Sequence, residues 1–474
     1  MTPRLVLASS PVSVEERYGV FAGAGSTEPS FGLLCLAASA RRSGADVAVV
    51  EASARNLDLP SALRDVLAFS PDVVGLTATT SEIVRAAELA ARIKQARPDI
   101  LTIVGGCHVT AIPEETLEAF PAFDMAVIGE GEETLGEILR ERAGGERVPG
   151  GIAGTVTRDG GTLRRHASRA LIASLDDLPL PAWDLLEGFP GLFRPSPGRI
   201  KRWPCASIVL TRGCPNRCVF CDRSVFGNRC RAYSPAYALN VVKDLVGRYG
   251  VRELLIEDDT FVISKDRVRE FCERLMAEKI ALSWSCLGRA DRVDPDLLAL
   301  MRKAGCWHIS YGIESGDPDI LKTMHKHLDL DQIRQAVRWS RDSGMRTKGF
   351  FIVGFPGETV ASLERTKAFA CSLPLDDISV MQMTPFPGSE LFGIADQYGT
   401  FTRDWRRMNV LNTVFVPHGF TREALEQARG DILKAFYLRP GVMWRQGLHT
   451  LRHPSLIPGV LGGFRAFRNA VRRV

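Results

Sequence analysis

The sequence predicts an α/β protein with an N-terminal doubly wound domain, a partial (β/α)6 barrel similar to a TIM barrel, and a helical C-terminal region. Short apolar runs alternate with amphipathic stretches up to about residue 142 and again from residue 208. This alternation is typical of parallel sheets covered by helices. A segment dense in proline and glycine separates the two series. We therefore expect domains at 1–145 and 201–395, a linker with a hairpin at 146–200, and an extension at 396–474.

Composition sets the broad class of the protein. The chain has 474 residues, which is too long for one ordinary core. The net charge of +5 gives no reason to expect a nucleic-acid partner. The eleven cysteines of so long a chain suggest a reduced compartment. Since no signal peptide or long apolar run is evident, we expect a cytoplasmic protein.

Five strands are predicted in the first domain, at residues 5–8, 47–50, 73–76, 101–104 and 125–128. Small and polar residues follow the last three strands, where doubly wound domains bind their ligands. The glycines among them also suit tight turns, and the histidine suits a hydrogen bond within its own loop. The candidate ligand-binding residues are Thr77, Thr79, Thr80, Gly105, Gly106, His108, Thr110, Gly129, Glu130 and Gly131.

Six more strands are predicted at residues 208–210, 253–256, 282–285, 307–311, 349–353 and 378–380, which suits a partial barrel with its chemistry at the carboxyl ends. Carboxylates after the second and fourth strands suit a ligand ammonium group, and an arginine after the third suits a ligand carboxylate. Acids also favour helix starts, and the arginine could instead form a surface salt bridge. The candidates are Glu257, Asp258, Arg289, Glu314, Ser315 and Gly354.

Three cysteines, Cys214, Cys218 and Cys221, follow the first barrel strand with spacings of x3 and x2. Several thiolates on one loop are typical ligands of an iron–sulfur cluster. Three cysteines bind three irons of a 4Fe–4S cube and leave the fourth iron open to a reacting ligand. The alternative is a four-cysteine zinc site that includes Cys205 and Cys230, although neither belongs to a paired Cys-x2–4-Cys hook.

This spacing, with Phe220 before the last cysteine, resembles the signature of radical S-adenosylmethionine enzymes. Up to about residue 392 the chain resembles the cobalamin-binding branch, through Gly-Gly-x-His-x-Thr at 105–110, Gly-Glu-Gly-Glu at 129–132 and the acids that follow Ile256. The resemblance implies a 4Fe–4S cluster on the three cysteines and cobalamin on the N-terminal loops. It implies S-adenosylmethionine beside Phe220, Glu257, Asp258, Arg289, Glu314, Ser315 and Gly354.

One departure concerns the lower ligand of cobalt. Many cobalamin domains supply it as the histidine of an Asp-x-His-x-x-Gly motif, which this sequence lacks. We therefore expect a different or absent lower ligand, with His108 as a contact only.

The resemblance implies a 5'-deoxyadenosyl radical and methylation of an unactivated carbon in a small-molecule metabolite. Its electron donor would be a carrier such as flavodoxin or ferredoxin. Two alternatives stay open. One is a non-methylating radical cyclase or oxidoreductase that resembles the anaerobic porphyrin cyclase, and the other is a non-catalytic redox or cobalamin-sensing protein.

The C-terminal tail is basic. Residues 434–474 carry eight Lys and Arg and no Asp or Glu, interleaved with apolar side chains. Such a tail suits peripheral contact with an anionic membrane. Prolines at 454 and 458 interrupt the apolar pattern, which favours a helical cap on the barrel instead.

Overall fold

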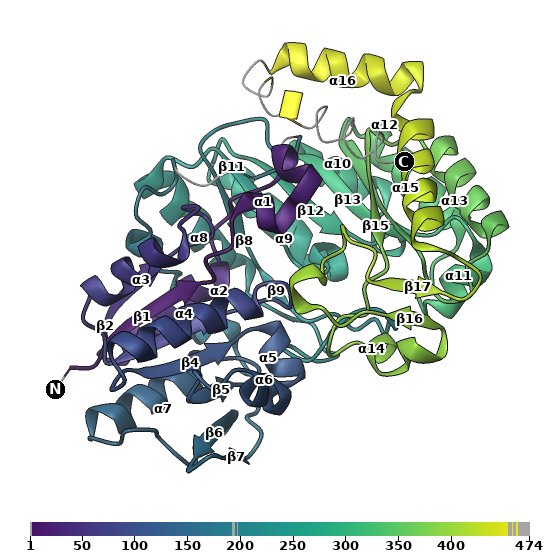
Figure 1. Ribbon diagram of the computed structural model, residues 1–474. Helices are drawn as coiled ribbons and strands as arrows, with labels where there is room; N and C mark the ends of the chain where they lie inside the picture. The colour runs from purple at the N-terminus through teal and green to yellow at the C-terminus, as the bar shows by residue number, and fades with distance from the viewer. Residues whose placement is uncertain (1, 192–194, 197, 454–456, 458–460, 463–474) are drawn as a thin grey trace.

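The computed structural model describes residues 2–191, 195–196, 198–453, 457 and 461–462. Two sheets lie side by side: the N-terminal unit, in purple and blue, occupies the lower left of Figure 1, and the barrel, in teal and green, lies to its right. Helix α16 lies above the barrel. The predicted fold class is confirmed.

The N-terminal sheet has seven strands in the order β2-β1-β3-β4-β5-β6-β7, of which the first five are parallel. The hairpin expected in the linker is β6–β7, and it pairs antiparallel with β5, so it extends this sheet. The bounds are β1 (Arg4–Ser9), β2 (Asp46–Val50), β3 (Val73–Thr77), β4 (Leu101–Gly105), β5 (Met125–Val127), β6 (Thr155–Asp159) and β7 (Thr162–Arg165).

Helices cover both faces of this sheet because its strands are apolar on both sides. In β1, Leu5 and Leu7 enter one core while Val6 and Ala8 enter the other, as the alternation of side chains along a strand requires. One core contains α2 (Phe31–Arg42) and α7 (Glu132–Ala143). The other contains α3 (Leu59–Ala68), α4 (Ile83–Ala96), α5 (Cys107–Ala111) and α6 (Pro113–Ala119).

The strand order creates a switch point between β1 and β3, from which the chain proceeds in opposite directions along the sheet. Ligands of such sheets bind beyond the carboxyl ends at this point. Ser10 lies there, and its hydroxyl donates to the carbonyl oxygen of Thr77 at 3.0 Å. Ser9 and Ser10 were not among the predicted site residues, although they follow β1 as the predicted residues follow β3.

The second sheet has six parallel strands in the order β15-β14-β13-β12-β11-β8, open between β8 and β15. This is the predicted partial barrel. The strands are β8 (Cys205–Ile208), β11 (Glu253–Ile256), β12 (Ser283–Gly288), β13 (Cys306–Glu314), β14 (Arg346–Val353) and β15 (Asp377–Gln382). The helices between them are α8 (Pro235–Tyr249), α9 (Lys265–Ala277), α10 (Pro295–Lys303), α11 (Pro318–Thr323), α12 (Leu330–Asp342) and α13 (Val360–Ser372).

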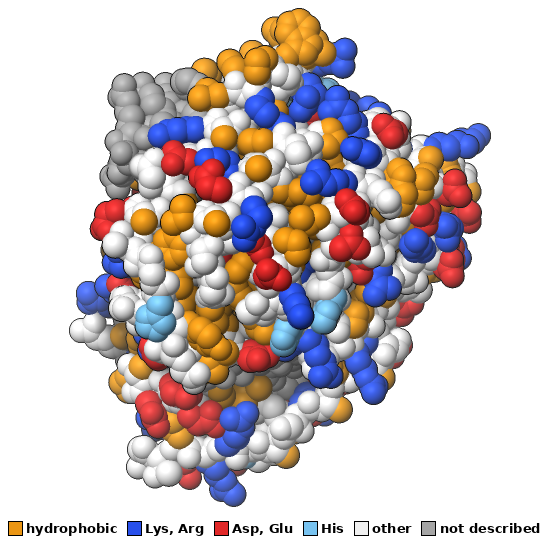
Figure 2. Space-filling model, turned by 90° about the vertical axis from the view of Figure 1, so that its right-hand side faces the viewer, with side chains coloured by type: hydrophobic (Ala, Val, Ile, Leu, Met, Phe, Trp, Pro, Cys, Tyr) orange, Lys and Arg blue, Asp and Glu red, His pale blue; other side chains and the backbone are white. Residues whose placement is uncertain are grey.

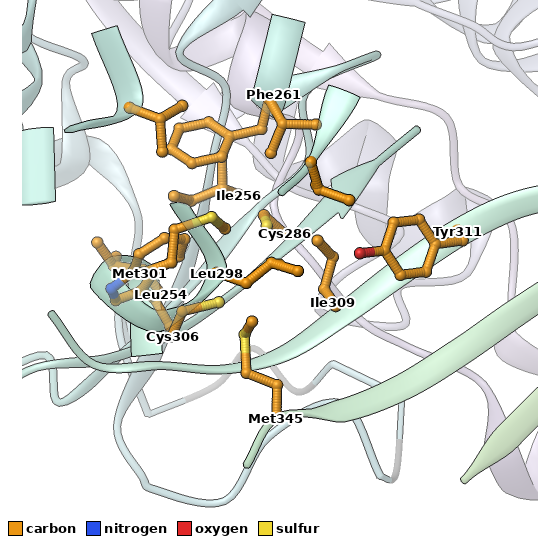
Figure 3. Packing of buried hydrophobic residues seen from close by; sticks show 14 of the residues in the cluster. Leu254, Ile256, Phe261, Cys286, Leu298, Met301, Cys306, Ile309, Tyr311 and Met345 are labelled. Atoms are coloured by element: carbon orange, nitrogen blue, oxygen red, sulfur yellow. The ribbon is translucent and has the colours of Figure 1, made fainter. Parts of the chain in front are cut away.

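The outer face of the barrel packs against these helices through a core rich in sulfur (Figure 3). Cys286, Cys306 and Met345 lie around Ile309, and the Tyr311 hydroxyl lies 2.7 Å from that of Ser340. Along β14 and β15, buried residues alternate with partly exposed ones. One face of these strands therefore packs on helices, while the other faces an interior that solvent reaches.

The C-terminal extension begins with a two-stranded ribbon, β16 (Gly399–Phe401) and β17 (Phe415–Pro417), and continues with α15 (Arg422–Tyr437) and α16 (Pro440–Arg452). Helix α16 lies across the amino ends of the barrel strands. Arg445 is ion-paired with Asp376, and the His449 ring stacks on Trp307. Among the described residues, no helix is long and apolar enough to cross a membrane.

Candidate active site

A short antiparallel ribbon closes the base of the cysteine loop. β9 (Thr211–Arg212) pairs with β10 (Arg231–Ala232), so the loop 213–230 leaves and re-enters the barrel at one place. Gly213 has φ +87°, and a Cβ there would collide with the carbonyl oxygen of Arg229. Because only glycine fits this crossing, the residue before the first cysteine is set by the closure of the loop.

The three thiols have polar partners that suit metal ligands. Asn216 Nδ2 donates to Cys214 Sγ at 3.1 Å, and the Thr260 hydroxyl lies 3.6 Å from the same sulfur. A hydrogen bond between Cys218 and Cys221 lowers the pKa of Cys218 to about 6 and raises that of Cys221. Hydrogen bonds to sulfur are typical around the cysteine ligands of an iron–sulfur cluster, and the thiolate of Cys218 is stabilised, so the loop fits the implied group.

A buried lysine beside the loop was missed by sequence reasoning. Lys326 Nζ donates to Glu314 Oε1 at 2.6 Å, and both side chains are buried. The charges of Lys326 and Arg289 also lower the pKa of Cys218. Glu314 adopts φ +68°, a left-handed conformation that costs energy for a residue other than glycine. Nothing in the segment around Lys326 signalled this role, because only the fold brings it to the cysteines.

Arg289 was predicted to grip a carboxylate or to form a surface salt bridge. The structure shows it buried, with Nε donating to Asp291 at 3.0 Å and Nη2 donating to the Lys326 carbonyl at 2.9 Å. The pair with Asp291 exists, but the arginine lies inside the site and not on the surface. Phe220 is partly buried in the cluster of apolar side chains that contains Val219.

Asp258 and Ser315 have protein partners for their side chains. Asp258 Oδ1 accepts the Leu210 N–H at 2.6 Å, and burial raises its pKa to about 6. The Ser315 hydroxyl lies 3.1 Å from that of Thr366 and accepts the Asp317 N–H at 3.1 Å. Asp258 therefore braces the strand that leads into the cysteine loop, and Ser315 braces the turn after Glu314.

Glu257 projects beside a carboxylate from the other unit. Its side chain is ion-paired with Arg199, and burial raises its pKa. Glu28, which precedes α2, accepts a hydrogen bond from the Ser207 hydroxyl of β8. Sequence reasoning did not select Glu28, because a lone acid between Thr27 and Pro29 carries no signal of its contact with the barrel.

Gly354 ends β14 in a turn held by a buried acid. It has φ +87°, and Glu358 Oε2 accepts the N–H groups of Gly354 and Phe355 at 2.6 and 3.2 Å. Glu358 Oε1 is buried without a hydrogen-bond partner. Burial raises the pKa of Glu358 to about 8, so this carboxyl group is largely protonated at neutral pH.

The zinc alternative does not fit the structure. Cys205 begins β8, at the far end of that strand from the cysteine loop, and Cys230 Sγ lies 4.0 Å from the Arg231 carbonyl oxygen. Within the part of the chain that the structure describes, no three His, Cys, Asp or Glu residues converge closely enough to hold a single metal ion.

The predicted cobalamin loops meet at the carboxyl edge of the N-terminal sheet. The hydroxyls of two threonines are committed to protein partners, since Thr79 donates to Glu82 at 2.9 Å and Thr110 accepts the Gly129 N–H at 3.0 Å. A Cβ on Gly106 would collide with Ala78, whereas one on Gly105 would lie 3.7 Å from the Val127 carbonyl oxygen. Gly105 and Gly129 thus leave open backbone at the carboxyl edge of the sheet, the edge at which such sheets bind ligands. A Cβ on Gly131 would instead lie 3.0 Å from the Leu36 side chain.

His108 is buried at this edge and is neutral. Its Nδ1 lies 3.2 Å from the Thr80 hydroxyl, and its ring meets the edge of Trp405 at 5.0 Å between centroids. Burial lowers the pKa of His108 to about 4. The histidine is therefore held within the protein, and Trp405 shows that the C-terminal extension reaches the N-terminal site.

The two sites lie against each other. A Cβ on Gly129 would be 3.8 Å from the carbonyl oxygen of Val225, in the cysteine loop. Gly388, in the loop after β15, lies against both the Asp222 side chain and Ala111 of α5. Glu130, a predicted cobalamin contact, instead binds Arg212 and Arg231 at the base of the cysteine loop.

Comparison with known proteins agrees with this arrangement. The B12 binding domain model matches residues 18–139, and the radical SAM superfamily model matches residues 208–370. An uncharacterized methyltransferase of Pyrococcus horikoshii is 32% identical over 88% of this chain and 90% of its own. The chain belongs to the cobalamin-binding radical S-adenosylmethionine enzymes.

Other relatives of the enzyme differ in reaction. The anaerobic magnesium-protoporphyrin IX monomethyl ester cyclase of Rubrivivax gelatinosus is 29% identical over 82% of this chain and 70% of its own. The hopanoid C-3 methylase of Methylococcus capsulatus is 26% identical over 85% and 75%. The methyltransferase TsrM of Kitasatospora setae, solved with cobalamin and a 4Fe–4S cluster, has the same fold, with a TM-score of 0.72 at 19% identity over 93% of this chain and 90% of its own.

We expect replacement of any one of Cys214, Cys218 and Cys221 by Ala to abolish the iron–sulfur cluster, because each removes a thiolate ligand. Cys230→Ala is the matched control, since Cys230 lies in the same loop without a thiol partner. Iron and sulfide content after anaerobic reconstitution measures the outcome. Loss of the cluster in Cys230→Ala, or its retention in Cys218→Ala, would contradict the ligand set.

Glu358 should make stability depend on pH. Its folded pKa of about 8 lies above the ordinary value of 4.5, so the stabilisation is present below about pH 4.5 and is lost as the pH rises through 8. The loss should be on the order of a few kcal/mol. Glu358→Gln keeps an oxygen for the two N–H groups and cannot ionise, so its free energy of unfolding should fall less between about pH 5 and about pH 9. Urea unfolding of both proteins without cofactors, at several pH values, tests this. An equal fall of the free energy of unfolding with pH in the two proteins would disprove it.

Proposed function

We propose that this enzyme is a cobalamin-dependent radical methyltransferase that methylates an unactivated carbon of a small molecule. The observation that carries the proposal is the direct contact between the cysteine loop and the loops at the carboxyl edge of the N-terminal sheet, through Gly129 and Val225 and through Ala111, Asp222 and Gly388. Methylation is favoured over cyclisation because the relative at 32% identity and the hopanoid methylase are named for methyl transfer.

When bound, the cluster supplies the electron that cleaves S-adenosylmethionine, and cobalamin supplies the methyl group. The residues of the chain bind and orient these groups. Cys214, Cys218 and Cys221 hold three irons. Lys326 and Glu314 form a buried cation and anion beside Cys218, which suits the carboxylate and the ammonium group of the methionine moiety.

The remaining predicted residues act around these groups. Arg289 holds the backbone of Lys326 by donating a hydrogen bond to the Lys326 carbonyl oxygen. The backbone of Gly354 suits contact with the adenine. Asp258 and Ser315 support the site through Leu210 and Thr366. Glu257 faces the barrel interior with Arg199, where it suits the substrate. On the N-terminal sheet, Ser9, Ser10 and the loops after β3, β4 and β5 suit cobalamin.

We also infer an acidic one-electron carrier, such as flavodoxin or ferredoxin, as the electron donor. Arg217 and Arg229 are exposed on the cysteine loop and suit such a partner. A reducing compartment, the cytoplasm, suits the protein because all eleven cysteines are free thiols.

Methyl-labelled S-adenosylmethionine tests the reaction. Anaerobically reconstituted enzyme with a low-potential reductant should yield 5'-deoxyadenosine, and a cell extract from an organism that expresses the enzyme should show a new labelled small molecule. An altered but unlabelled product would favour the cyclase or oxidoreductase. Cobalamin binding without 5'-deoxyadenosine would favour the non-catalytic sensor.

We further propose that α16 rests on an anionic membrane surface. Met443, Trp444 and Leu451 are more than half exposed, and at about 100° per residue they share one side of the helix. Apolar side chains at the top of the molecule in Figure 2 lie next to basic ones. Phe464 and Phe467 of the tail lie outside the described residues.

Flotation with vesicles tests the membrane contact. The enzyme should float with phosphatidylglycerol vesicles more than with phosphatidylcholine vesicles, and Trp444→Ser with Leu451→Ser should weaken binding roughly tenfold. Val360→Ser, an exposed apolar position on α13, is the control. Equal flotation with both lipids would contradict the preference for an anionic surface. Concentration-dependent dimers that the double variant abolishes would show that a second copy of the chain covers α16 instead.

A further inference from the structure

A buried ion-pair network joins the N-terminal unit to the cysteine loop. Glu130 Oε1 accepts from Arg212 Nη1 at 2.7 Å, and Oε2 accepts from Arg231 Nη1 at 2.8 Å and from the Ile172 N–H at 2.8 Å. Glu132 Oε1 accepts from Arg212 Nη2 at 2.6 Å. Two carboxylates thus face two guanidinium groups, so the network is balanced in charge.

The residues of this network lie in segments of two different units. Glu130 lies between Gly129 and Gly131, in the loop after β5 at the carboxyl edge of the N-terminal sheet. Arg212 and Arg231 lie opposite each other in β9 and β10, the ribbon that closes the cysteine loop. One side chain therefore contacts both strands that hold the loop, and its own backbone belongs to the loop predicted to bind cobalamin.

Both carboxylate oxygens of Glu130 are hydrogen-bonded and the side chains are largely buried, which restricts the contact. Arg231 Nε and Nη2 are buried without a hydrogen-bond partner. The side chain of Glu130 is 3% exposed and that of Arg212 is 7% exposed. Arginine hydrogen bonds to a carboxylate are short and directional. The two arginines lower the pKa of Glu130 although burial raises it, so the carboxylate stays charged at neutral pH. Loss of one partner from such a pair leaves a buried charge without compensation.

We infer that Glu130 is a positioning residue that fixes the distance between the iron–sulfur cluster and cobalamin. The inference rests on the proposed function for the identity of the two groups. The ion-pair network itself is formed by residues of the chain alone. It links the entrance and the exit of the cysteine loop to the edge of the other sheet. Both carboxylate oxygens of Glu130 are taken by Arg212, Arg231 and the Ile172 N–H, so in this inference it acts through the two arginines.

The first experiment uses the full chain without cofactors. In Glu130→Gln, backbone amides of residues 211–232 should exchange hydrogen roughly tenfold faster than in the wild type, because the base of the loop opens more often. Glu133→Gln is the matched control: Glu133 lies on the same helix as Glu132, but its side chain is 58% exposed. Unchanged exchange in Glu130→Gln would overturn the inference.

The second experiment measures the distance directly. Pulsed electron paramagnetic resonance of the reduced cluster and cob(II)alamin, both bound to the enzyme, should give a narrow distance distribution in the wild type and in Glu133→Gln. The distribution should broaden or shift in Glu130→Gln at equal cluster content. A merely structural residue would change stability and leave this distribution unchanged, which would refute the positioning role.

Two further variants keep the test decisive. Glu130→Asp retains the charge but shortens the side chain, so it should shift the distance with less broadening. If Glu130→Gln does not fold, Arg231→Met removes the same contact from the other side and should also speed the exchange of residues 211–232. If the wild type binds no cobalamin, the proposed function fails, whereas the exchange experiment still decides whether Glu130 holds the loop.

Discussion

The carboxyl ends of two parallel sheets lie against each other, and the rest of the structure depends on this contact. Parallel strands gather the loops that follow them at one edge. In this enzyme the edge of the N-terminal sheet meets the cysteine loop that follows the first barrel strand, through Gly129 and Val225. Two sites that lie far apart in the sequence thereby become one.

Contacts between the units hold this arrangement in register. Glu28 crosses from the N-terminal unit to Ser207 of β8, and Glu130 crosses to β9 and β10. The ring of Trp405, in the C-terminal extension, contacts the ring of His108 in the N-terminal unit. Ionic and hydrogen-bonded contacts are directional, so they define a relative position that an apolar interface alone would leave free to slide.

A buried ion pair lies beside the cysteines. Lys326 and Glu314 are paired in the interior, and the cation lies near Cys218. An anionic cluster bound to three thiolates gains from such a cation where water is excluded. Glu314 sits in a left-handed conformation beside this pair, and strain of that kind persists only where the surrounding structure fixes it.

The elements could be predicted and the three cysteines selected from the sequence, because apolar periodicity and ligand spacing are local properties. The sequence also located the loops at the strand ends, since parallel strands always place them at one edge. The contacts of each polar side chain, in contrast, depend on how distant segments pack in the folded chain. Glu130 and Glu314 look alike as acids after a strand, yet one joins two units and the other pairs with Lys326 beside the cysteines. Lys326, Glu28 and Trp405 had no local signal, because their roles come from residues distant in the chain.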